Sequence, residues 1–128
     1  MSDVPLPAPA LKGVVLLCTD LMLTSAVGGA ASAAGIQFRS VPDVLQAVES
    51  AKTFDGVLLL IDLAARGFFV SDLQHHFSEE LLTQAVAYGP HVHEQLLQDA
   101  RDAGIGTVLS RGQFNTRFPQ LIRQFVSS

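Results

Sequence analysis

The sequence is short of cysteine, of charge and of long hydrophobic runs, and each shortage weighs against a class of protein. A single cysteine in 128 residues rules out an internal disulfide framework and any zinc cluster built on cysteines. Charged residues make up only 16% of the chain, and the net charge of −4 disfavours binding to nucleic-acid phosphates. The apolar runs are far shorter than the roughly twenty residues that a membrane-spanning helix needs.

What remains points to one globular domain. Hydrophobic residues make up 48% of the sequence, which is enough apolar surface to argue against disorder. The N-terminus lacks a basic start followed by an apolar core, so no secretory signal is evident, and we expect a cytoplasmic domain. Residues 1–11 carry Pro5, Pro7 and Pro9 and are expected to form a flexible leader before a single domain over 12–128.

Short apolar runs alternate along the chain with helix-like segments. The runs are rich in Val, Leu and Ile, as expected of strands that are buried on both faces. They predict strands over 13–18, 36–41, 56–61, 85–88 and 106–109. The segments between and after them predict helices over 21–34, from Pro42 onward, 73–84, 94–103 and 116–126.

Helix boundaries and buried helix faces follow from the same patterns. Gly35 and Gly104 are expected to end the first and fourth helices, and Pro42 to open the second at its first position. The residues expected to face the core are Val44, Leu45, Val48, Leu96, Leu97, Ala100, Phe118, Leu121, Ile122, Phe125 and Val126.

Five strands alternating with five helices predict an open α/β fold with a parallel sheet and helices on both of its faces. Folds of this kind place their sites at the carboxyl ends of the strands. The positions of interest are therefore 18–20, Asp62, 88–90 and 110–112.

At these positions the sequence resembles the receiver domain of bacterial two-component response regulators. The resemblance covers about residues 12–126 and depends on spacing and element order more than on identity. It implies a five-stranded, flavodoxin-like sheet in three α/β/α layers. It also implies a site in which an acidic pair holds Mg²⁺, an aspartate accepts a phosphoryl group, and a Ser or Thr and a Lys contact that group.

This chain keeps only part of the receiver pattern. Thr19 and Asp20 fall at the acidic pair, Asp62 at the phosphoacceptor, Gly89 at the Ser/Thr switch and Arg111 at the lysine. Two positions keep their residue type, one keeps only its charge, and two are lost. The resemblance therefore implies a divergent pseudo-receiver that is not regulated by ordinary aspartyl phosphorylation.

Each of these residues also has a purely structural interpretation. Asp62 is either a phosphoacceptor or a strand-end residue that caps the next turn or pairs with Arg111. Asp20 is either a Mg²⁺ ligand together with Asp62 or the N-cap of the first helix. Two carboxylates are few protein ligands for Mg²⁺, and no other cofactor is predicted. Cys18 is interpreted as a small buried hydrophobe.

Two further local features have weak functional interpretations. Gly28 and Gly29, inside the Ala-rich first helix, suggest a phosphate-binding loop, but the Rossmann spacing and the Walker lysine are absent. Close packing or a helix break is therefore favoured. His91 and His93 suggest a metal site with Glu94, but their spacing matches no established metal motif, so surface positions are favoured.

The sequence predicts a stand-alone signalling domain that acts by protein contact and is not an enzyme. The resemblance makes the fourth helix, fifth strand and fifth helix the expected surface for a partner or a second copy. Arg111, Arg117 and Arg123 make this end of the chain locally basic. Two alternatives stay open: a phosphoacceptor receiver with a relaxed site at Asp62, and a flavodoxin-like domain that binds a small ligand or nucleotide.

Overall fold

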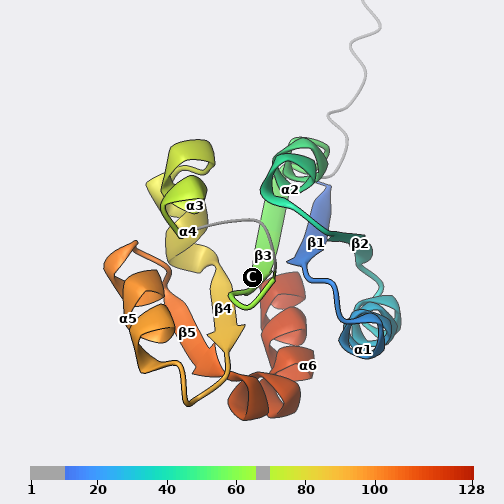
Figure 1. The fold of residues 1–128 in the computed structure, drawn as a ribbon. Coiled ribbons are helices and arrows are strands. Elements are labelled where there is room, and N and C mark those ends of the chain that lie inside the picture. Colours follow the sequence, from blue (N-terminus) through green and yellow to red (C-terminus); the bar gives the residue numbers. More distant parts are fainter. Residues whose placement is uncertain (1–10, 66–69) are drawn as a thin grey trace, which may run out of the picture.

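Five parallel strands form one sheet in the order β2-β1-β3-β4-β5 (Figure 1). The computed structural model describes residues 11–65 and 70–128, so the predicted leader lies outside the described residues except for Leu11. The strands are β1 (Lys12–Leu17), β2 (Gln37–Val41), β3 (Gly56–Asp62), β4 (Val86–Gly89) and β5 (Thr107–Ser110). The predicted parallel sheet is confirmed.

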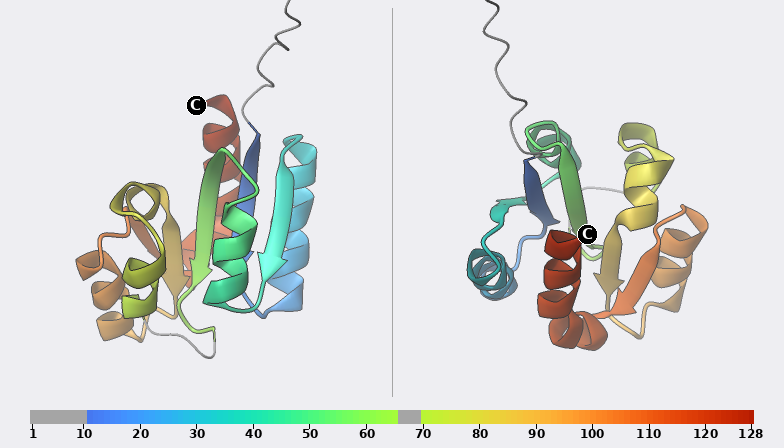
Figure 2. Two further views of the ribbon diagram at one scale, coloured as in Figure 1. Left: turned by 90° about the horizontal axis from the view of Figure 1, so that it is seen from above. Right: turned by 180° about the vertical axis from the view of Figure 1, so that it is seen from behind.

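Helices cover both faces of this sheet. They are α1 (Leu21–Ala33), α2 (Val44–Ala51), α3 (Val70–His76), α4 (Glu79–Gln84), α5 (Glu94–Asp102) and α6 (Arg111–Ser127). Helices α1 and α6 pack on one face, and α2, α3, α4 and α5 pack on the other (Figure 2). The predicted three-layer α/β/α architecture is therefore confirmed. Over residues 11–65 and 70–128, no helix is long and apolar enough to span a membrane.

Strand β1 shows why the apolar runs of the sequence are continuous. In β1, Val15 and Leu17 face the α2–α5 layer, while Val14 and Leu16 face α1 and α6. All four side chains have no exposed surface. Because neighbouring residues of a strand point to opposite faces, a strand covered on both sides needs an apolar residue at every position.

The helix predicted over 73–84 is wrong, because the structure has two helices there. Helix α3 ends at His76, and α4 begins after Ser78, whose hydroxyl accepts a hydrogen bond from the Leu81 amide at 3.2 Å. Serine at an N-cap stabilises a new helix start. Phe77, between the two helices, is buried in the core. The described residues thus form six helices, and the predicted fourth and fifth helices are α5 and α6.

Two predicted helix starts are also wrong. Asp43, and not Pro42, starts the second helix, because the Asp43 carboxylate accepts a hydrogen bond from the Gln46 amide at 2.9 Å. The last helix begins at Arg111 rather than at residue 116, because Ser110 caps it. The Ser110 hydroxyl accepts from the Gln113 amide at 3.2 Å, and the Gln113 side chain accepts from the Ser110 amide at 2.9 Å. This reciprocal pair is a capping box.

Of the eleven residues expected to face the core from helices, five are buried, four are partly buried and two are exposed. Leu45 is 66% exposed, since α2 packs through Val44, Ala47 and Val48 and residue 45 lies beside that stripe. Val126, near the end of α6, is 38% exposed. Val48, Leu96, Leu121 and Phe125 are only partly buried against the core. Phe114 has no exposed surface, although the sequence prediction placed it outside a helix.

Gly28 and Gly29 lie inside the continuous helix α1, so they form neither a phosphate-binding loop nor a helix break. A Cβ at Gly28 would lie 3.1 Å from the Phe38 ring on β2, whereas a Cβ at Gly29 would meet nothing within 4 Å. The close-packing interpretation is therefore confirmed for Gly28.

Replacing Gly106 by alanine is expected to destabilise the protein. A Cβ at this position would lie 1.7 Å from the Thr83 carbonyl oxygen, which is backbone and cannot rotate away. We expect the free energy of unfolding in urea to fall by about 1–3 kcal/mol, with an unchanged m value. The matched control is Gly112→Ala in α6, where a Cβ meets nothing within 4 Å. Equal stability of the two variants would contradict the prediction.

Candidate functional site

A row of three buried side chains crosses the carboxyl end of the sheet. Cys18 follows β1, Asp62 ends β3 and Tyr88 lies in β4, and the strand register places them side by side. Their exposed fractions are 5%, 7% and 1%. Among the described residues, Asp62 is the charged residue whose side chain is buried. We call Cys18, Asp62 and Tyr88 the buried row.

Asp62 caps the turn that follows β3. Its Oδ1 accepts a hydrogen bond from the Ala64 amide at 2.9 Å, and its Oδ2 lies 3.7 Å from the Cys18 sulfur. Within residues 11–65 and 70–128, no basic side chain forms an ion pair with Asp62, and Arg111 pairs elsewhere. The Asp62–Arg111 pair considered from the sequence is absent, while the turn cap is present.

Asp20 performs two tasks with one carboxylate. Its Oδ1 is the N-cap of α1 and accepts from the amides of Met22 at 2.9 Å and Leu23 at 3.3 Å. Its Oδ2 accepts a hydrogen bond from Nη2 of Arg111 and forms an ion pair with it. The amide of Leu23, with help from Arg111 and Met22, holds the pKa of Asp20 below its usual value.

Arg111 reaches Asp20 because of where α6 begins. It is the first residue of α6, directly after the last residue of β5, and the Ser110 capping box sets the backbone there. Half of its side chain is exposed. Arg111 was predicted at the lysine position, near Asp62. It instead forms an ion pair with Asp20, the remaining member of the acidic pair.

Tyr88 lies among the strand-end positions 88–90 that the sequence singled out, but no role was predicted for it. Its ring stacks on Phe114 of α6, with the ring centroids 4.0 Å apart. Its buried hydroxyl has no hydrogen-bond partner of ordinary geometry among the described residues. Burial raises the pKa of Tyr88 far above its usual value, and the nearby Cys18 thiol and Asp62 carboxylate raise it further. The sequence signal for a buried hydroxyl here was a tyrosine inside a strand predicted to be buried on both faces.

The two lost receiver positions supply no catalytic group. Thr19 is exposed in the loop after β1. Gly89 is buried at the end of β4, where a Cβ would make ordinary contacts with Leu97 and Leu63 at 3.5 and 3.6 Å. The site therefore lacks a hydroxyl at the switch position, although a small side chain would fit there.

Comparison with known proteins decides the fold. No protein-family model and no curated protein matches the sequence. A response regulator receiver domain from Rhodospirillum rubrum is similar in structure, with a TM-score of 0.62 at 17% identity over 91% of each chain. The receiver domain of a sensor histidine kinase from Pseudomonas aeruginosa PAO1 has a TM-score of 0.66 at 15% identity. That match covers 94% of this chain and 100% of the other.

This chain has the receiver-domain fold. A third neighbour, the beryllofluoride-activated NtrC4 receiver domain dimer, has a TM-score of 0.66 at 12% identity, over 89% of this chain and 98% of that one. At these identities the likeness establishes the fold alone. Domains with the receiver fold thus include one that forms a dimer, and the Pseudomonas domain has a magnesium ion coordinated in its active site cleft.

The residues of this receiver fold do not fit Mg²⁺. Magnesium requires oxygen ligands in near-octahedral geometry. The Asp20 carboxylate already accepts hydrogen bonds from two amides and a guanidinium, and the group beside Asp62 is the Cys18 thiol, which is a soft ligand. No cluster of three or more His, Cys, Asp or Glu residues suited to a metal occurs within residues 11–65 and 70–128. His91 and His93 are exposed, in agreement with the favoured prediction.

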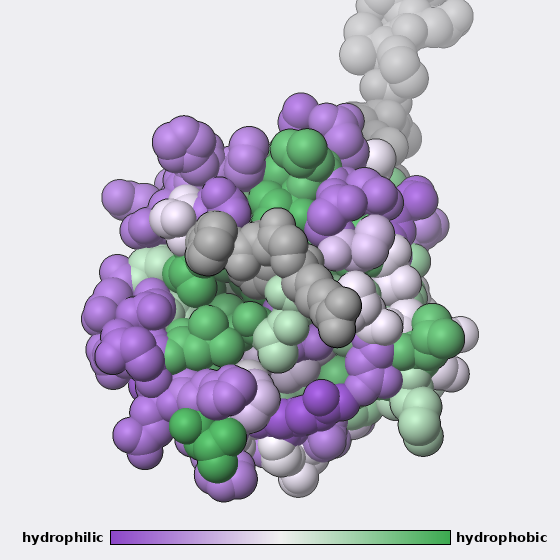
Figure 3. Space-filling view, in the orientation of Figure 1, coloured by the Kyte–Doolittle hydropathy of each residue, from purple (hydrophilic) through white to green (hydrophobic). Residues whose placement is uncertain are grey.

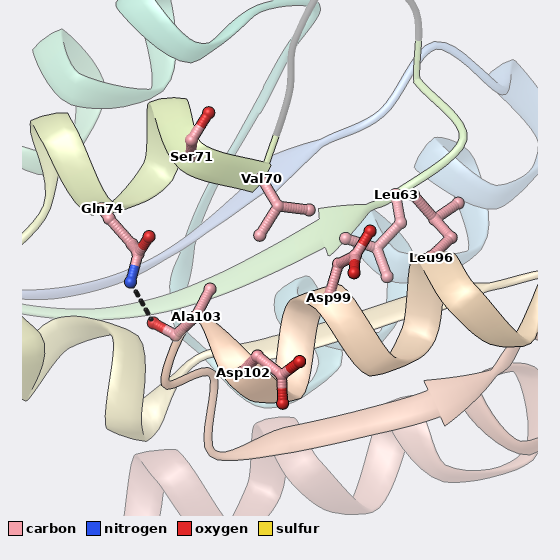
Figure 4. A pocket seen from close by; sticks show the side chains of 8 residues that line it. All are labelled: Leu63, Val70, Ser71, Gln74, Leu96, Asp99, Asp102 and Ala103. Carbon is pink, nitrogen blue, oxygen red and sulfur yellow. Dashed lines mark hydrogen bonds between the residues drawn. The ribbon is translucent and has the colours of Figure 1, made fainter.

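This protein also has a groove between α3 and α5, with a volume of about 400 Å³ (Figure 4). Leu63, Val70 and Leu96 form its apolar part, and Asp99 and Asp102 lie beside it. Figure 3 shows hydrophobic side chains in this region with hydrophilic ones on their outer side. The groove contains none of the strand-end residues predicted for the site.

Replacing Tyr88 by phenylalanine is expected to stabilise the domain. The change removes a buried hydroxyl that lacks a partner among the described residues, and it keeps the stacking on Phe114. We expect the free energy of unfolding to rise by about 1 kcal/mol. Far-UV circular dichroism is the appropriate probe in urea, because Tyr88 is the only tyrosine and tryptophan is absent.

Phe114→Leu is the control, because it removes the stacked ring and is expected to destabilise the protein. A loss of stability in Tyr88→Phe would show that the hydroxyl is bound in solution, for example by a buried water.

Proposed function

We propose that this receiver-fold domain acts by contact with a protein and is not controlled by ordinary aspartyl phosphorylation. The observation that carries the proposal is that Arg111 is bound to Asp20, so that no cation within residues 11–65 and 70–128 pairs with Asp62. A carboxylate that accepts a phosphoryl group gains negative charge, which a metal or a cationic side chain must neutralise. Among the described residues, the partners of the Asp62 carboxylate are the Ala64 amide and the Cys18 thiol.

The proposal also holds that the domain is not an enzyme and works in the cytoplasm. Reactive cysteines lie next to basic groups, whereas the Cys18 thiol is buried next to an acid. The base beside the Cys18 thiol is the Asp62 carboxylate, 3.7 Å from the sulfur, and a carboxylate is a weak base for a buried thiol. A single buried free thiol suits a reducing compartment.

Treatment with acetyl phosphate and Mg²⁺ tests this proposal. We expect the intact mass of the wild-type protein to stay unmodified, while a phosphorylatable receiver domain treated in parallel gains a phosphoryl group. Asp62→Ala and the exposed-residue control Asp99→Ala should both match the wild type. A stoichiometric adduct present in wild type and in Asp99→Ala but lost in Asp62→Ala would overturn the proposal. It would establish the alternative, a receiver with a relaxed site at Asp62.

The proposed contact surface consists of α5, β5 and α6, and its proposed occupant is a second copy of the chain. Strand β5 lies at the edge of the sheet. Helix α5 has exposed acids at Glu94, Asp99 and Asp102, whereas α6 has exposed Arg117 and Arg123. In a two-fold dimer, the acidic α5 of each copy can face the basic α6 of the other. The NtrC4 receiver domain supports this proposal as an example of a dimer on the same fold.

Charge reversal on α6 tests this surface. We expect sedimentation velocity to show a concentration-dependent dimer that weakens as salt rises, because exposed charges are screened within about 10 Å at 0.1 M salt. The double variant R117E/R123E is expected to be monomeric at the same concentrations. Lys52→Glu is the control, since Lys52 is an exposed cation that follows α2. A wild-type monomer at every concentration, or an unchanged dimer in the double variant, would contradict the proposal.

A further inference from the structure

The groove between α3 and α5 plays no part in the strand-end site. Figure 4 shows Leu63, Val70 and Leu96 beside one another at one end of it, where they form an apolar floor. Leu63 is buried, whereas Val70 and Leu96 are only partly buried. The groove therefore presents apolar surface at its opening, which is the kind of surface that a binding partner can cover.

A second hollow continues this groove toward the amino ends of β4 and β5. It has a volume of about 370 Å³ and shares Gln74, Asp102 and Ala103 with the first hollow. Phe77 and Leu82 add apolar side chains to it. Helix α5, which has nine residues and is about 14 Å long, forms one wall. The groove therefore has room for about two to three turns of a partner helix.

The two walls of the groove are held at a fixed distance. The side-chain amide of Gln74 on α3 donates a hydrogen bond to the Ala103 carbonyl oxygen at 3.3 Å, drawn as a dashed line in Figure 4. Below this bond, Leu73 of α3 and Leu97 of α5 are buried in the same hydrophobic cluster. The groove is thus preformed, and a partner would not lose binding energy in ordering it.

Two acidic side chains of α5 border the groove. Asp99 and Asp102 line it and are exposed. Their Oδ1 atoms accept hydrogen bonds from the neutral side-chain amides of Gln95, at 2.7 Å, and Gln98, at 2.9 Å. The ion pairs formed within residues 11–65 and 70–128 involve other residues. Within that part of the chain, both negative charges are therefore left for a binding partner to neutralise.

The position of these two acids does not favour the helix that carries them. Asp99 and Asp102 lie in the last turn of α5, where the partial negative charge of the helix end disfavours carboxylates. Glu94, in the first turn, is at the end where an acid is favourable. Helix stability thus explains Glu94 but not the acids of the groove, which points to a cation outside this helix.

We propose that this groove binds a basic amphipathic helix of a partner protein. Apolar side chains of that helix would pack on Leu63, Val70 and Leu96, as in other complexes of a helix with a groove. Its lysines or arginines would face Asp99 and Asp102. A nucleotide or another phosphate-bearing ligand does not fit here, because its negative charge would meet the same carboxylates.

The inference rests on the proposed function in one respect, which is that the domain acts by contact with a protein. It adds a second surface and a different partner to the dimer contact. Asp99 and Asp102 are also among the exposed acids of the proposed dimer surface, so we expect the two contacts to compete.

The experiment uses a fluorescein-labelled peptide of leucine and lysine, about fourteen residues long, with its leucines on one helical face. Fluorescence anisotropy is expected to show binding with a Kd on the order of 10 μM that weakens as salt rises. Amide signals of α3 and α5 should shift in the ¹⁵N spectrum. A peptide of the same composition, scrambled to remove the apolar face, should bind about tenfold more weakly or worse.

A matched pair of double variants makes the result specific. D99N/D102N is expected to fold, by its amide spectrum, because it removes charges that the helix end disfavours. Its affinity for the peptide should fall about tenfold or more, since two attracting charges are lost. E49Q/E94Q removes the same charge from exposed acids outside the groove and should bind the peptide nearly as the wild type does.

Two further variants test the place of binding. Ser71 is an exposed residue that lines the groove, and Ser71→Arg should weaken binding by placing a bulky like charge in the path of the peptide. The variant R117E/R123E, which lacks the basic side of the proposed dimer contact, should bind the peptide at least as tightly as the wild type.

Four outcomes would overturn the inference: no binding to the wild type at low salt, equal binding of the scrambled peptide, equal weakening in D99N/D102N and E49Q/E94Q, or loss of binding in R117E/R123E. The second and third would indicate a general attraction between charges, and the fourth a site on the dimer surface. The proposed function is tested by intact mass and sedimentation without this peptide, so its failure is distinguishable from the failure of this inference.

Discussion

The carboxylate of Asp20 connects helices α1 and α6 at the carboxyl end of the sheet. Asp20 caps α1 with one oxygen and binds Arg111 of α6 with the other. Both helices lie on the same face of the sheet, over the buried row of Cys18, Asp62 and Tyr88. Because Arg111 is engaged in this way, Asp62 remains next to a thiol and a backbone amide, and the character of the whole site follows from that arrangement.

The buried row explains how a sheet edge rich in polar groups is accommodated in a protein with so few charges. Asp62 is buried, but its oxygens contact the Ala64 amide and the Cys18 sulfur, which partly replaces the solvent it has lost. Tyr88 adds a hydroxyl that lacks a hydrogen-bond partner in the described part of the chain, and its ring, stacked on Phe114, connects β4 to α6. The three side chains of the buried row are closed to solvent, whereas Thr19, Asp20 and Arg111 at the same edge are exposed or partly exposed.

Local sequence signals explain both the success and the errors of prediction. The strands were predictable because runs such as 56–61 are apolar at every position, which only a doubly covered strand requires. The helix starts were less accurate. Ser78, Asp43 and Ser110 each cap a helix through a side-chain hydrogen bond, and all three were visible as favoured N-cap residues. Gly112 lies in the first turn of α6, which was predicted to begin only at 116, although the capping box starts at Ser110.

The sequence by itself determined the parallel α/β sheet and the set of residues that meet at its carboxyl edge. It could do so because alternating strands and helices bring the ends of parallel strands to one side, wherever the loops run. Only the tertiary structure decided which acid Arg111 binds. Both Asp20 and Asp62 follow neighbouring strands, and a long side chain can reach in more than one direction. The start of α6 at Arg111 and the capping of α1 by Asp20 place that guanidinium on Asp20 and away from the aspartate at the phosphoacceptor position.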